Sequence, residues 1–430
     1  MEYLLQILLA LVVLFVLARI GSILVSKFGL PGLIGEIIMG IIIANLAFGD
    51  WSLLDTLGIT LPEAGTDDTG SDVYHVIYAF AELGVIFLLF SVGLETKVSD
   101  LLNSGKPALL CAVMGVIIPF ILGFAVIIAY DGNMNHALFM AAAMVATSVG
   151  ITARIIKDMK LMDTREARII IAAAVIDDVL GMIVLAIVKG MASSGELSIA
   201  SILTVTIEAV VFVLAVIAFC KWGVPRIYDY FDERKRKKLA EGKVPMSVNK
   251  LALAIIVCLV FAMLAEWIGL AAIIGAFLAG MIFAEHAWEW DLEGKIDSIS
   301  TFMLSFFFLN VGMQVDIGIL TDLTVDLLII VIIVLAILSK YIGCALGAKM
   351  GDKTLDKSSL NIIGFGMAPR GEVGIIVASI GLSTGAMSSE LYAVVVFMSV
   401  LTTIIAPPII SRLFKKKYHE EYKIVADDRL

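Results

Sequence analysis

The stretch GLPGLIGEIIMG, from Gly29 to Gly40, decides the fold because the chain contains a second version of it. The stretch from Gly269 to Gly280 reads GLAAIIGAFLAG, and the two align without a gap. FSVGLE then follows the first copy and LNVGMQ follows the second, with their Val-Gly pairs in register. Apolar helices share a simple composition, so one match has little weight. Two matches in the same order predict an internal repeat.

The composition places this repeat in a membrane. Of the 430 residues, 60% are hydrophobic and 17% are charged, whereas soluble domains are about 45–50% apolar and about 25% charged. Helices pair every backbone polar group internally, which lipid requires. We therefore expect an all-α polytopic membrane protein and exclude a soluble enzyme, a disordered chain and a disulfide scaffold. The net charge of −9 gives no support for nucleic-acid binding, and the four cysteines form no CxxC metal motif.

Apolar runs that are long enough to cross a bilayer appear thirteen times. The first has no basic leader or cleavage site, so we interpret it as a retained helix rather than a signal peptide. Lysine and arginine gather in the loops after the odd-numbered runs, which predicts an outside N-terminus and a cytoplasmic C-terminus. The basic run ERKRKK (Glu233 to Lys238) fits this orientation signal better than an anionic-lipid site. The predicted spans are residues 3–26, 31–48, 75–94, 107–130, 134–157, 165–190, 199–222, 249–267, 269–286, 297–314, 325–350, 359–383 and 389–413.

The two copies of the repeat are seven spans apart. Because seven is odd, equivalent helices cross the membrane in opposite directions. This inverted topology is typical of secondary transporters whose site lies near the middle of the bilayer. Two six-helix halves and one linking helix, the seventh, account for the thirteen spans.

Charged side chains near the bilayer centre are the first candidate functional residues, since each costs about 2.5–3.5 kcal/mol on insertion scales. The sixth span, AAAVIDDVLGM, carries Asp177 and Asp178 near its middle. Neighbouring helix residues point about 100° apart, so one carboxylate can face a partner helix and the other a water-filled cavity. The eleventh span has one buried charge, Lys340. One of these two carboxylates is the energetically most favourable partner for it.

The twelfth span contains helix-breaking residues. It reads NIIGFGMAPRGEVGIIVASIGL, in which Pro369 lies between Gly366 and Gly371, with Arg370 and Glu372 close by. Proline removes a helix hydrogen bond and glycine loosens the helix. We therefore expect this span to be broken.

Its counterpart, the fifth span, reads MVATSVGITARII and has Gly150 among the hydroxyls of Thr147, Ser148 and Thr152. One interpretation is a kink whose hydroxyls bond back to the helix. The other is a pair of broken helices whose free carbonyls and helix dipoles line a cation site. The second interpretation gives Thr147 and Ser148 a function as ligands.

Three further acids lie in or near the spans. Glu36 and Glu82 either line an ion path or are hydrogen-bonded scaffold carboxyls, and the scaffold interpretation is favoured. Glu266 is expected at the outer interface.

Four motifs taken together resemble the monovalent cation/proton antiporters, in the branch with paired aspartates. They are ATSVGIT (146–152), IDD (176–178), SK (339–340) and PRGEVG (369–374), and they come from four spans in the family's order. The resemblance covers essentially the whole chain. It implies exchange of sodium or lithium for protons by alternating access, with an elevator-like core movement and without a cofactor. It also implies a homodimer among the lipids of a prokaryotic cell membrane.

The resemblance also assigns roles to residues. Asp178 is the main cation carboxylate, and Asp177 is the second acid, which pairs with Lys340 in the proton-loaded site. Sodium would bind at Asp178 and Asp177, with Thr147 and Ser148 nearby. Relatives thought to be electroneutral have asparagine in place of the first aspartate, so this chain is expected to be electrogenic. The broken-helix and charge-compensating residues are Gly150, Thr152, Gly366, Pro369, Arg370, Gly371 and Glu372.

The family fold implies two domains, each built from two parts of the chain. The scaffold and dimerisation domain takes spans one to three and eight to ten, and the ion-transport core takes spans four to six and eleven to thirteen. The implied boundaries are scaffold 1–103 and 249–324, core 104–192 and 325–414, linking helix with basic loop 193–248, and cytoplasmic tail 415–430.

A potassium/proton antiporter on the same fold is the nearest alternative function. Potassium-efflux relatives often carry glutamine at the first aspartate and a soluble nucleotide-binding domain after the last helix, which we expect this chain to lack. An ion channel is less favoured, because the inverted repeat is typical of transporters and no filter-like motif occurs. We expect no enzyme, since the sequence shows no nucleophile–base or metal-ligand cluster.

Overall fold

The computed structural model is helical in its described part, apart from a two-residue hairpin of β1 (Ala47–Phe48) and β2 (Trp51–Ser52). Within that part, eight helices are long and apolar enough to cross a membrane, and three shorter apolar helices accompany them. The seventh predicted span lies outside the described residues except for positions 207 and 211, and the basic run ERKRKK lies wholly outside them. The structure describes residues 2–28, 30–48, 51–62, 70–96, 104–194, 207, 211, 249–268, 271–284, 287, 290–319 and 323–427.

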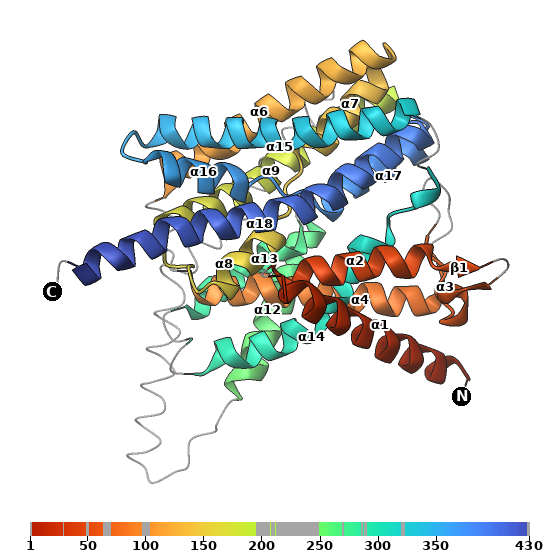
Figure 1. Cartoon of the computed structure of the whole chain (residues 1–430), viewed down its shortest axis with the longest axis horizontal. Coiled ribbons are helices and arrows are strands. Elements are labelled where there is room, and N and C mark those ends of the chain that lie inside the picture. Colours follow the sequence, from red (N-terminus) through yellow and green to blue (C-terminus); the bar gives the residue numbers. More distant parts are fainter. Residues whose placement is uncertain are drawn as a thin grey trace, which may run out of the picture.

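One bundle brings together helices from the first part of the chain and from its middle (Figure 1). In it, α2 packs against α1 and α14, while α13 packs against α12 and α4. Ser71 caps the start of α4 by accepting a hydrogen bond from the backbone of Tyr74. The members are α1 (Glu2–Ser26), α2 (Gly32–Asn45), the short α3 (Leu53–Thr56), α4 (Asp72–Leu94), α12 (Lys250–Trp267), α13 (Ala272–Phe283) and α14 (Leu292–Met313). We call this set the first bundle.

Glycine allows two pairs of helices in the first bundle to approach closely. A Cβ added at Gly40 of α2 would lie 2.2 Å from the carbonyl oxygen of Leu309 on α14. A Cβ added at Gly280 of α13 would lie 2.2 Å from the carbonyl oxygen of Phe90 on α4. Both neighbours are backbone atoms, so a larger residue at either crossing would force the helices apart.

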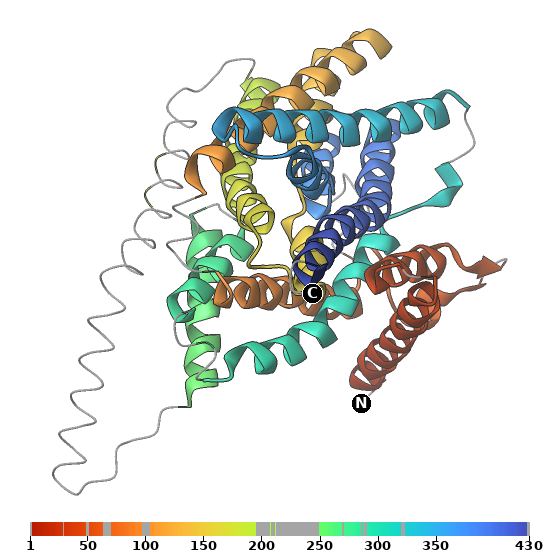
Figure 2. The ribbon, with the colours of Figure 1, turned by 60° about the vertical axis from the view of Figure 1, so that its left-hand side comes forward.

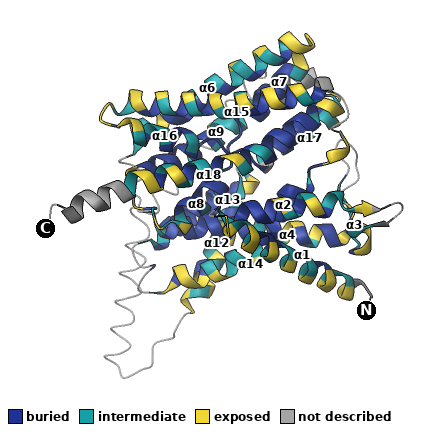
Figure 3. Ribbon diagram, in the orientation of Figure 1, coloured by how far each residue is buried: buried dark blue, intermediate teal, exposed yellow. Residues whose placement is uncertain are grey.

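The second bundle contains the remaining helices, and the two views of the chain agree on this grouping (Figures 1 and 2). α6 packs along α15, and α17 packs against α7 and α18. α7 and α17 are largely buried, whereas α6 and α15 present an exposed face (Figure 3). The last predicted span, 389–413, continues as helix to Asp427. The members are α6 (Gly105–Tyr130), α7 (Met134–Val145), α8 (Val149–Asp158), α9 (Arg165–Ser194), α15 (Leu323–Gly351), α16 (Lys357–Gly366), α17 (Glu372–Ser383) and α18 (Ser389–Asp427), with the short η2 (Ile317–Ile319) preceding α15.

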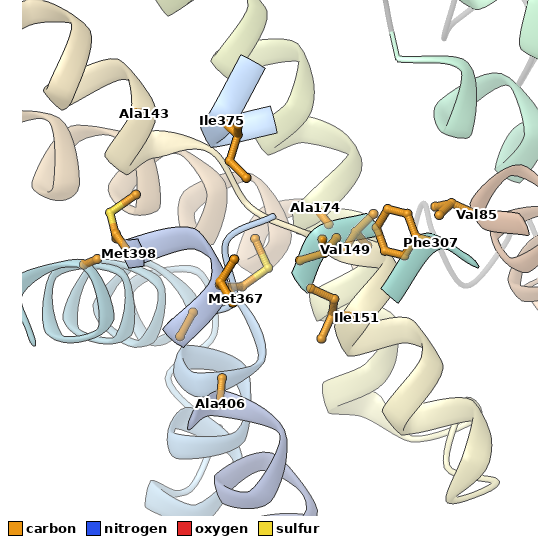
Figure 4. Packing of buried hydrophobic residues seen from close by; sticks show 14 of the residues in the cluster. Val85, Ala143, Val149, Ile151, Ala174, Phe307, Met367, Ile375, Met398 and Ala406 are labelled. Carbon is orange, nitrogen blue, oxygen red and sulfur yellow. The ribbon is translucent and has the colours of Figure 1, made fainter. Parts of the chain in front are cut away.

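The two bundles meet where α8 packs against α4 and α18 packs against α2. The close-up of this contact shows Phe307 of α14 beside Val149 of α8 (Figure 4). A Cβ added at Gly150 would lie 3.3 Å from Val85 of α4. The contact is therefore apolar at the start of α8, and Gly150 lets the helix lie close to the first bundle.

Candidate functional site

Two helices of the second bundle are interrupted in their middle, at the positions that carry the predicted site. The predicted span 134–157 is divided into α7, which ends at Val145, and α8, which begins at Val149. The predicted span 359–383 is divided into α16, which ends at Gly366, and α17, which begins at Glu372. The two non-helical segments are residues 146–148 and 367–371.

The two interrupted segments bond directly to each other. The backbone N–H of Ser148 donates to the carbonyl of Pro369 at 2.9 Å, and the hydroxyl of Thr152 donates to the carbonyl of Gly366 at 2.6 Å. A Cβ at Gly371 would lie 2.7 Å from the side chain of Ser148. The approach therefore requires glycine at position 371, and it provides partners for backbone groups that a broken helix leaves unpaired.

Gly150 was expected at the break of the fifth span, but it lies within a helix. It lies inside the first turn of α8, and a Cβ added to it would point toward α4 of the first bundle. The interruption falls just before it, at Ala146–Ser148, where the sequence has no proline or glycine. Glu372 is the first residue of α17; its side chain lies outside the described part.

Two positively charged side chains, those of Arg370 and Lys340, lie at the C-terminal end of α7. Arg370 donates from Nη1 to the carbonyl of Ala146 at 2.7 Å and from Nη2 to the carbonyl of Ala336 at 2.9 Å. Lys340 of α15 donates from Nζ to the carbonyl of Val145 at 2.8 Å. The last carbonyls of a helix carry partial negative charge, so this end is a favourable place for positive groups.

Lys340 also pairs with Asp177 of α9, at 2.7 Å between Nζ and Oδ1. Both side chains are buried, with 0% and 1% exposure. A buried ion pair of this kind persists only when its desolvation is offset by good geometry and further hydrogen bonds. The bond from Lys340 to Val145 is such a bond.

Asp178 follows Asp177 in α9 and differs from it in exposure, because it is only partly buried. Successive helix residues point in different directions, so the two carboxylates occupy different environments. Thr147 and Ser148 are both 4% exposed. The hydroxyl of Thr147 has no hydrogen-bond partner among the described residues, which makes its oxygen available to a ligand.

Sequence reasoning missed Thr402 and Thr403 of α18, both fully buried. Thr402 accepts a hydrogen bond from the backbone N–H of Arg370 at 3.1 Å, and Thr403 donates one to the carbonyl of Arg370 at 2.5 Å. The signal for them in the sequence is a pair of adjacent hydroxyls within the long apolar part of α18, a pattern that is common in membrane helices.

Sequence reasoning also treated Lys157 of α8 only as part of the orientation signal. Its Nζ lies 3.1 Å from Asp297 of α14, donates to Ser91 of α4 at 2.8 Å and contacts the carboxylate of Glu95. Burial raises the pKa of Glu95 to about 7, although Lys157 lowers it. This polar cluster joins the two bundles at the end of α8.

Glu36 of α2 is held within the first bundle. It is buried, accepts a hydrogen bond from Ser305 of α14 at 3.2 Å and lies 4.0 Å from Arg19 of α1. These contacts agree with the interpretation of Glu36 as a hydrogen-bonded carboxyl of the scaffold. Glu82 is partly buried.

Interrupted helices that meet around buried charges are typical of secondary transporters. The chain belongs to the sodium/hydrogen exchanger family, because the profile described as "Sodium/hydrogen exchanger, transmembrane" matches residues 11–416. It is accordingly an integral membrane protein.

Relatives and solved structures agree with the family. The chain is 33% identical to the high-affinity Na⁺/H⁺ antiporter NhaS3 of Synechocystis, over 96% of this chain and 91% of that one. It is 30% identical to the Na⁺/H⁺-K⁺ antiporter GerN of Bacillus cereus, over 91% and 92% of the two chains. The fold is similar to that of the sodium proton antiporter MjNhaP1 of Methanocaldococcus jannaschii, with a TM-score of 0.65, 15% identity and 95% of each chain covered.

Proposed function

We propose that this protein exchanges sodium, or lithium, for protons across a prokaryotic cell membrane, with Asp178 and Asp177 as the carboxylates for which the ions compete. The observation that carries the proposal is the buried Asp177–Lys340 pair beside the partly exposed Asp178, next to the contact between two interrupted helices. NhaS3, which is 33% identical, is named for Na⁺/H⁺ antiport.

The exchange follows from competition for the same carboxylates. Two carboxylates held close and partly desolvated need a positive partner, which a proton or a metal cation can supply. A sodium ion that enters from one side replaces the protons, and protons return when it leaves on the other side. Lys340 supplies positive charge to Asp177 when no sodium is bound.

Thr147 and Ser148 are the proposed neutral ligands of the cation. Sodium prefers oxygen ligands, and the unpartnered hydroxyl of Thr147 offers one without a competing bond. Arg370 and Lys340 bind the carbonyls of Ala146 and Val145, so the negative end of α7 is already compensated. The carboxylates, rather than this helix end, would then attract the ion.

We further propose the inverted repeat, the thirteen-helix fold and an elevator-like movement of the second bundle against the first. The glycine contacts support the repeat. Gly40 and Gly280 hold equivalent positions in the two copies of the motif. Gly40 contacts the backbone of α14, which carries LNVGMQ, and Gly280 contacts the backbone of α4, which carries FSVGLE. Two halves related by an inverted repeat would pack against each other in this reciprocal way. The first bundle would be the scaffold and dimerisation domain, and the second the transport core.

Potassium is the second candidate substrate, because GerN, which is 30% identical, is named a Na⁺/H⁺-K⁺ antiporter. The carboxylate and hydroxyl oxygens of the site can bind either ion. We favour sodium because NhaS3 has the higher identity. Since the proposal is transport, no chemical reaction is assigned to the site.

Reconstituted proteoliposomes test the proposal. Proton movement driven by sodium, lithium or potassium is followed with an internal pH dye, with and without a clamped membrane potential. We expect sodium to drive proton movement, a positive-inside potential to change its rate, and Asp178→Asn to abolish it. Glu36→Gln is the control, since Glu36 is bonded within the first bundle. Exchange that persists in Asp178→Asn would contradict the site, and exchange unaffected by potential would contradict the electrogenic assignment.

A further inference from the structure

Lys157, near the end of α8, belongs to the second bundle, but its charged partners in the described part belong to the first. Its Nζ lies 3.1 Å from Asp297 and 4.0 Å from Glu293, both on α14, and it contacts the carboxylate of Glu95 on α4. Ser91 of α4 accepts a hydrogen bond from Lys157 at 2.8 Å and donates one to Asp297 at 2.6 Å. These five residues make up the polar cluster between the bundles.

The charges of the polar cluster are divided between the two bundles. The first bundle supplies three acidic side chains, and the second supplies the ammonium group that lies among them. The side chain of Lys157 is only 10% exposed, and salt screens partly buried pairs less than exposed ones. The cluster therefore favours the arrangement in which the end of α8 lies against α4 and α14.

The repeat places an equivalent pair of polar residues at the opposite end of α4 and α14. The register of FSVGLE with LNVGMQ makes Asn310 the counterpart of Ser91, and it makes Gln314 the counterpart of Glu95. The side chains of Asn310 and Gln314 face the hydroxyl of Tyr74, at the start of α4. The start of each of these two helices thus meets the end of the other, and the two polar pairs lie at opposite ends.

The two ends differ in charge. At the α8 end, the carboxyl group of Glu95 and the hydroxyl of Ser91 both contact the ammonium of Lys157. Their counterparts are neutral amides beside a phenol, which cannot form an ion pair. Hydrogen bonds with an ionised partner are about twice as strong as those between neutral groups. The first bundle therefore offers a stronger attachment at the α8 end than at the other.

We propose that the polar cluster is a latch that holds the second bundle in the position seen here, so that this is the resting position and the latch opens in every transport cycle. The inference rests on the proposed elevator-like movement of the second bundle against the first. A position that moves α8 away from α4 leaves the three acidic side chains without Lys157. The neutral pair at the opposite end supplies no ion pair in exchange.

The distance between two spin labels tests the resting position without measuring transport. Lys295 of the first bundle and Lys349 of the second are both exposed, and each is replaced by a labelled cysteine in protein whose four native cysteines are changed to alanine. Pulsed electron resonance in lipid nanodiscs should show one dominant distance. Lys157→Gln should raise the ratio of a second distance to the first about tenfold, as expected for the loss of a charged hydrogen bond. Lys157→Arg keeps the charge and should keep the wild-type distribution.

A reversible cross-link tests whether the latch has to open. Cysteines at Glu95 and Lys157 are joined by a short bifunctional thiol reagent that a reductant cleaves, and sodium-driven proton exchange is measured in proteoliposomes. We expect exchange to fall at least about tenfold on joining and to return on reduction. Arg165 and Asp352 form the matched control, because they are an ion pair within the second bundle. A cross-link between cysteines at these two positions should leave exchange unchanged.

The inference is overturned if Lys157→Gln keeps the wild-type distances, or if protein joined at positions 95 and 157 exchanges as fast as unjoined protein. If Lys157→Gln does not fold, Asp297→Asn, which keeps the lysine, should shift the distances in the same direction by a smaller amount, and an unchanged distribution there overturns the inference too. Failure of the proposed function looks different. The unjoined protein would then show no sodium-driven proton movement, while the spin-label distances would still report the latch.

Discussion

At the scale of single residues, Asp177 and Lys340 form a buried ion pair, which carries a large desolvation cost. Both groups are out of water, and their attraction has to offset the desolvation of two charges. The geometry does this with a contact of 2.7 Å and a further bond from Lys340 to the end of α7. Removal of either partner would leave the other charge buried without compensation.

We therefore expect Lys340→Gln to destabilise the protein by about 3–5 kcal/mol, the cost typical of an unpaired buried charge. The double variant Asp177→Asn with Lys340→Gln should recover most of this loss, since two neutral amides can hydrogen-bond to each other. Thermal unfolding in detergent at pH 7 measures both effects. A single variant as stable as the wild type, or a double variant no better than the single one, would show that the pair is not a stabilising unit.

The sequence alone predicts Asp177, Asp178, Lys340 and Arg370 as candidate site residues, because a charged side chain in a long apolar run is energetically costly. It did not select Thr402 or Lys157. A threonine in a membrane helix costs little and can bond to its own backbone, and a lysine near a helix end usually marks orientation. Only the fold shows that Thr402 bonds to Arg370 and that Lys157 meets Glu95.

At the scale of elements, the interrupted helices show what a local pattern can and cannot predict. The break near Pro369 follows from the chemistry of the backbone. The break at residues 146–148 contains Ala, Thr and Ser and has no such cause in its own sequence. It is stabilised from outside, by Arg370, Lys340 and Pro369, which provide partners for backbone groups of residues 145–148. These partners come from two other predicted spans, so a sequence window cannot reveal them.

The glycine crossings of the first bundle give a prediction at this scale. A Cβ at Gly312 would lie 2.1 Å from the carbonyl of Ile37, and one at Gly280 would lie 2.2 Å from that of Phe90. Gly312→Ala and Gly280→Ala should each lower the thermal unfolding midpoint, because overpacking costs about 1–3 kcal/mol. Gly181→Ala on α9 is the control, since a Cβ there meets nothing within 4 Å. It should be neutral or slightly stabilising. Equal effects at all three positions would show that close approach is not the cause.

At the scale of the whole molecule, the two bundles are joined by an apolar contact at the start of α8 and by a polar cluster at its end. Gly150 and Val149 lie against Val85 and Phe307. Six residues of α8 (Val149–Asp158) separate Gly150 from Lys157, which contacts the acidic residues of the polar cluster. The span pattern predicted the helices of both bundles, but the packing of α8 on α4 depends on contacts between distant parts of the chain, and no period in the sequence encodes them.

The polar cluster makes the stability of this junction depend on pH, and the sign follows from Glu95. Burial raises its pKa from 4.5 to about 7, despite the opposing effect of Lys157. The folded protein thus binds this proton more tightly than the unfolded chain does, so protonation stabilises the fold. The stabilisation is fully present below about pH 4.5 and is lost as the pH rises through 7.

Glu95→Gln imitates the protonated carboxyl at every pH, while Lys157 keeps Asp297 and Ser91 as partners. We expect the unfolding midpoint of the wild type to fall relative to the variant between pH 5 and pH 8.5, by roughly 2–5 °C. Lys157→Gln should move the loss of stability to higher pH, because Lys157 lowers the pKa of Glu95. Parallel pH curves for the wild type and Glu95→Gln would show that another group controls the junction, since only a carboxyl that titrates between the two pH values can separate them.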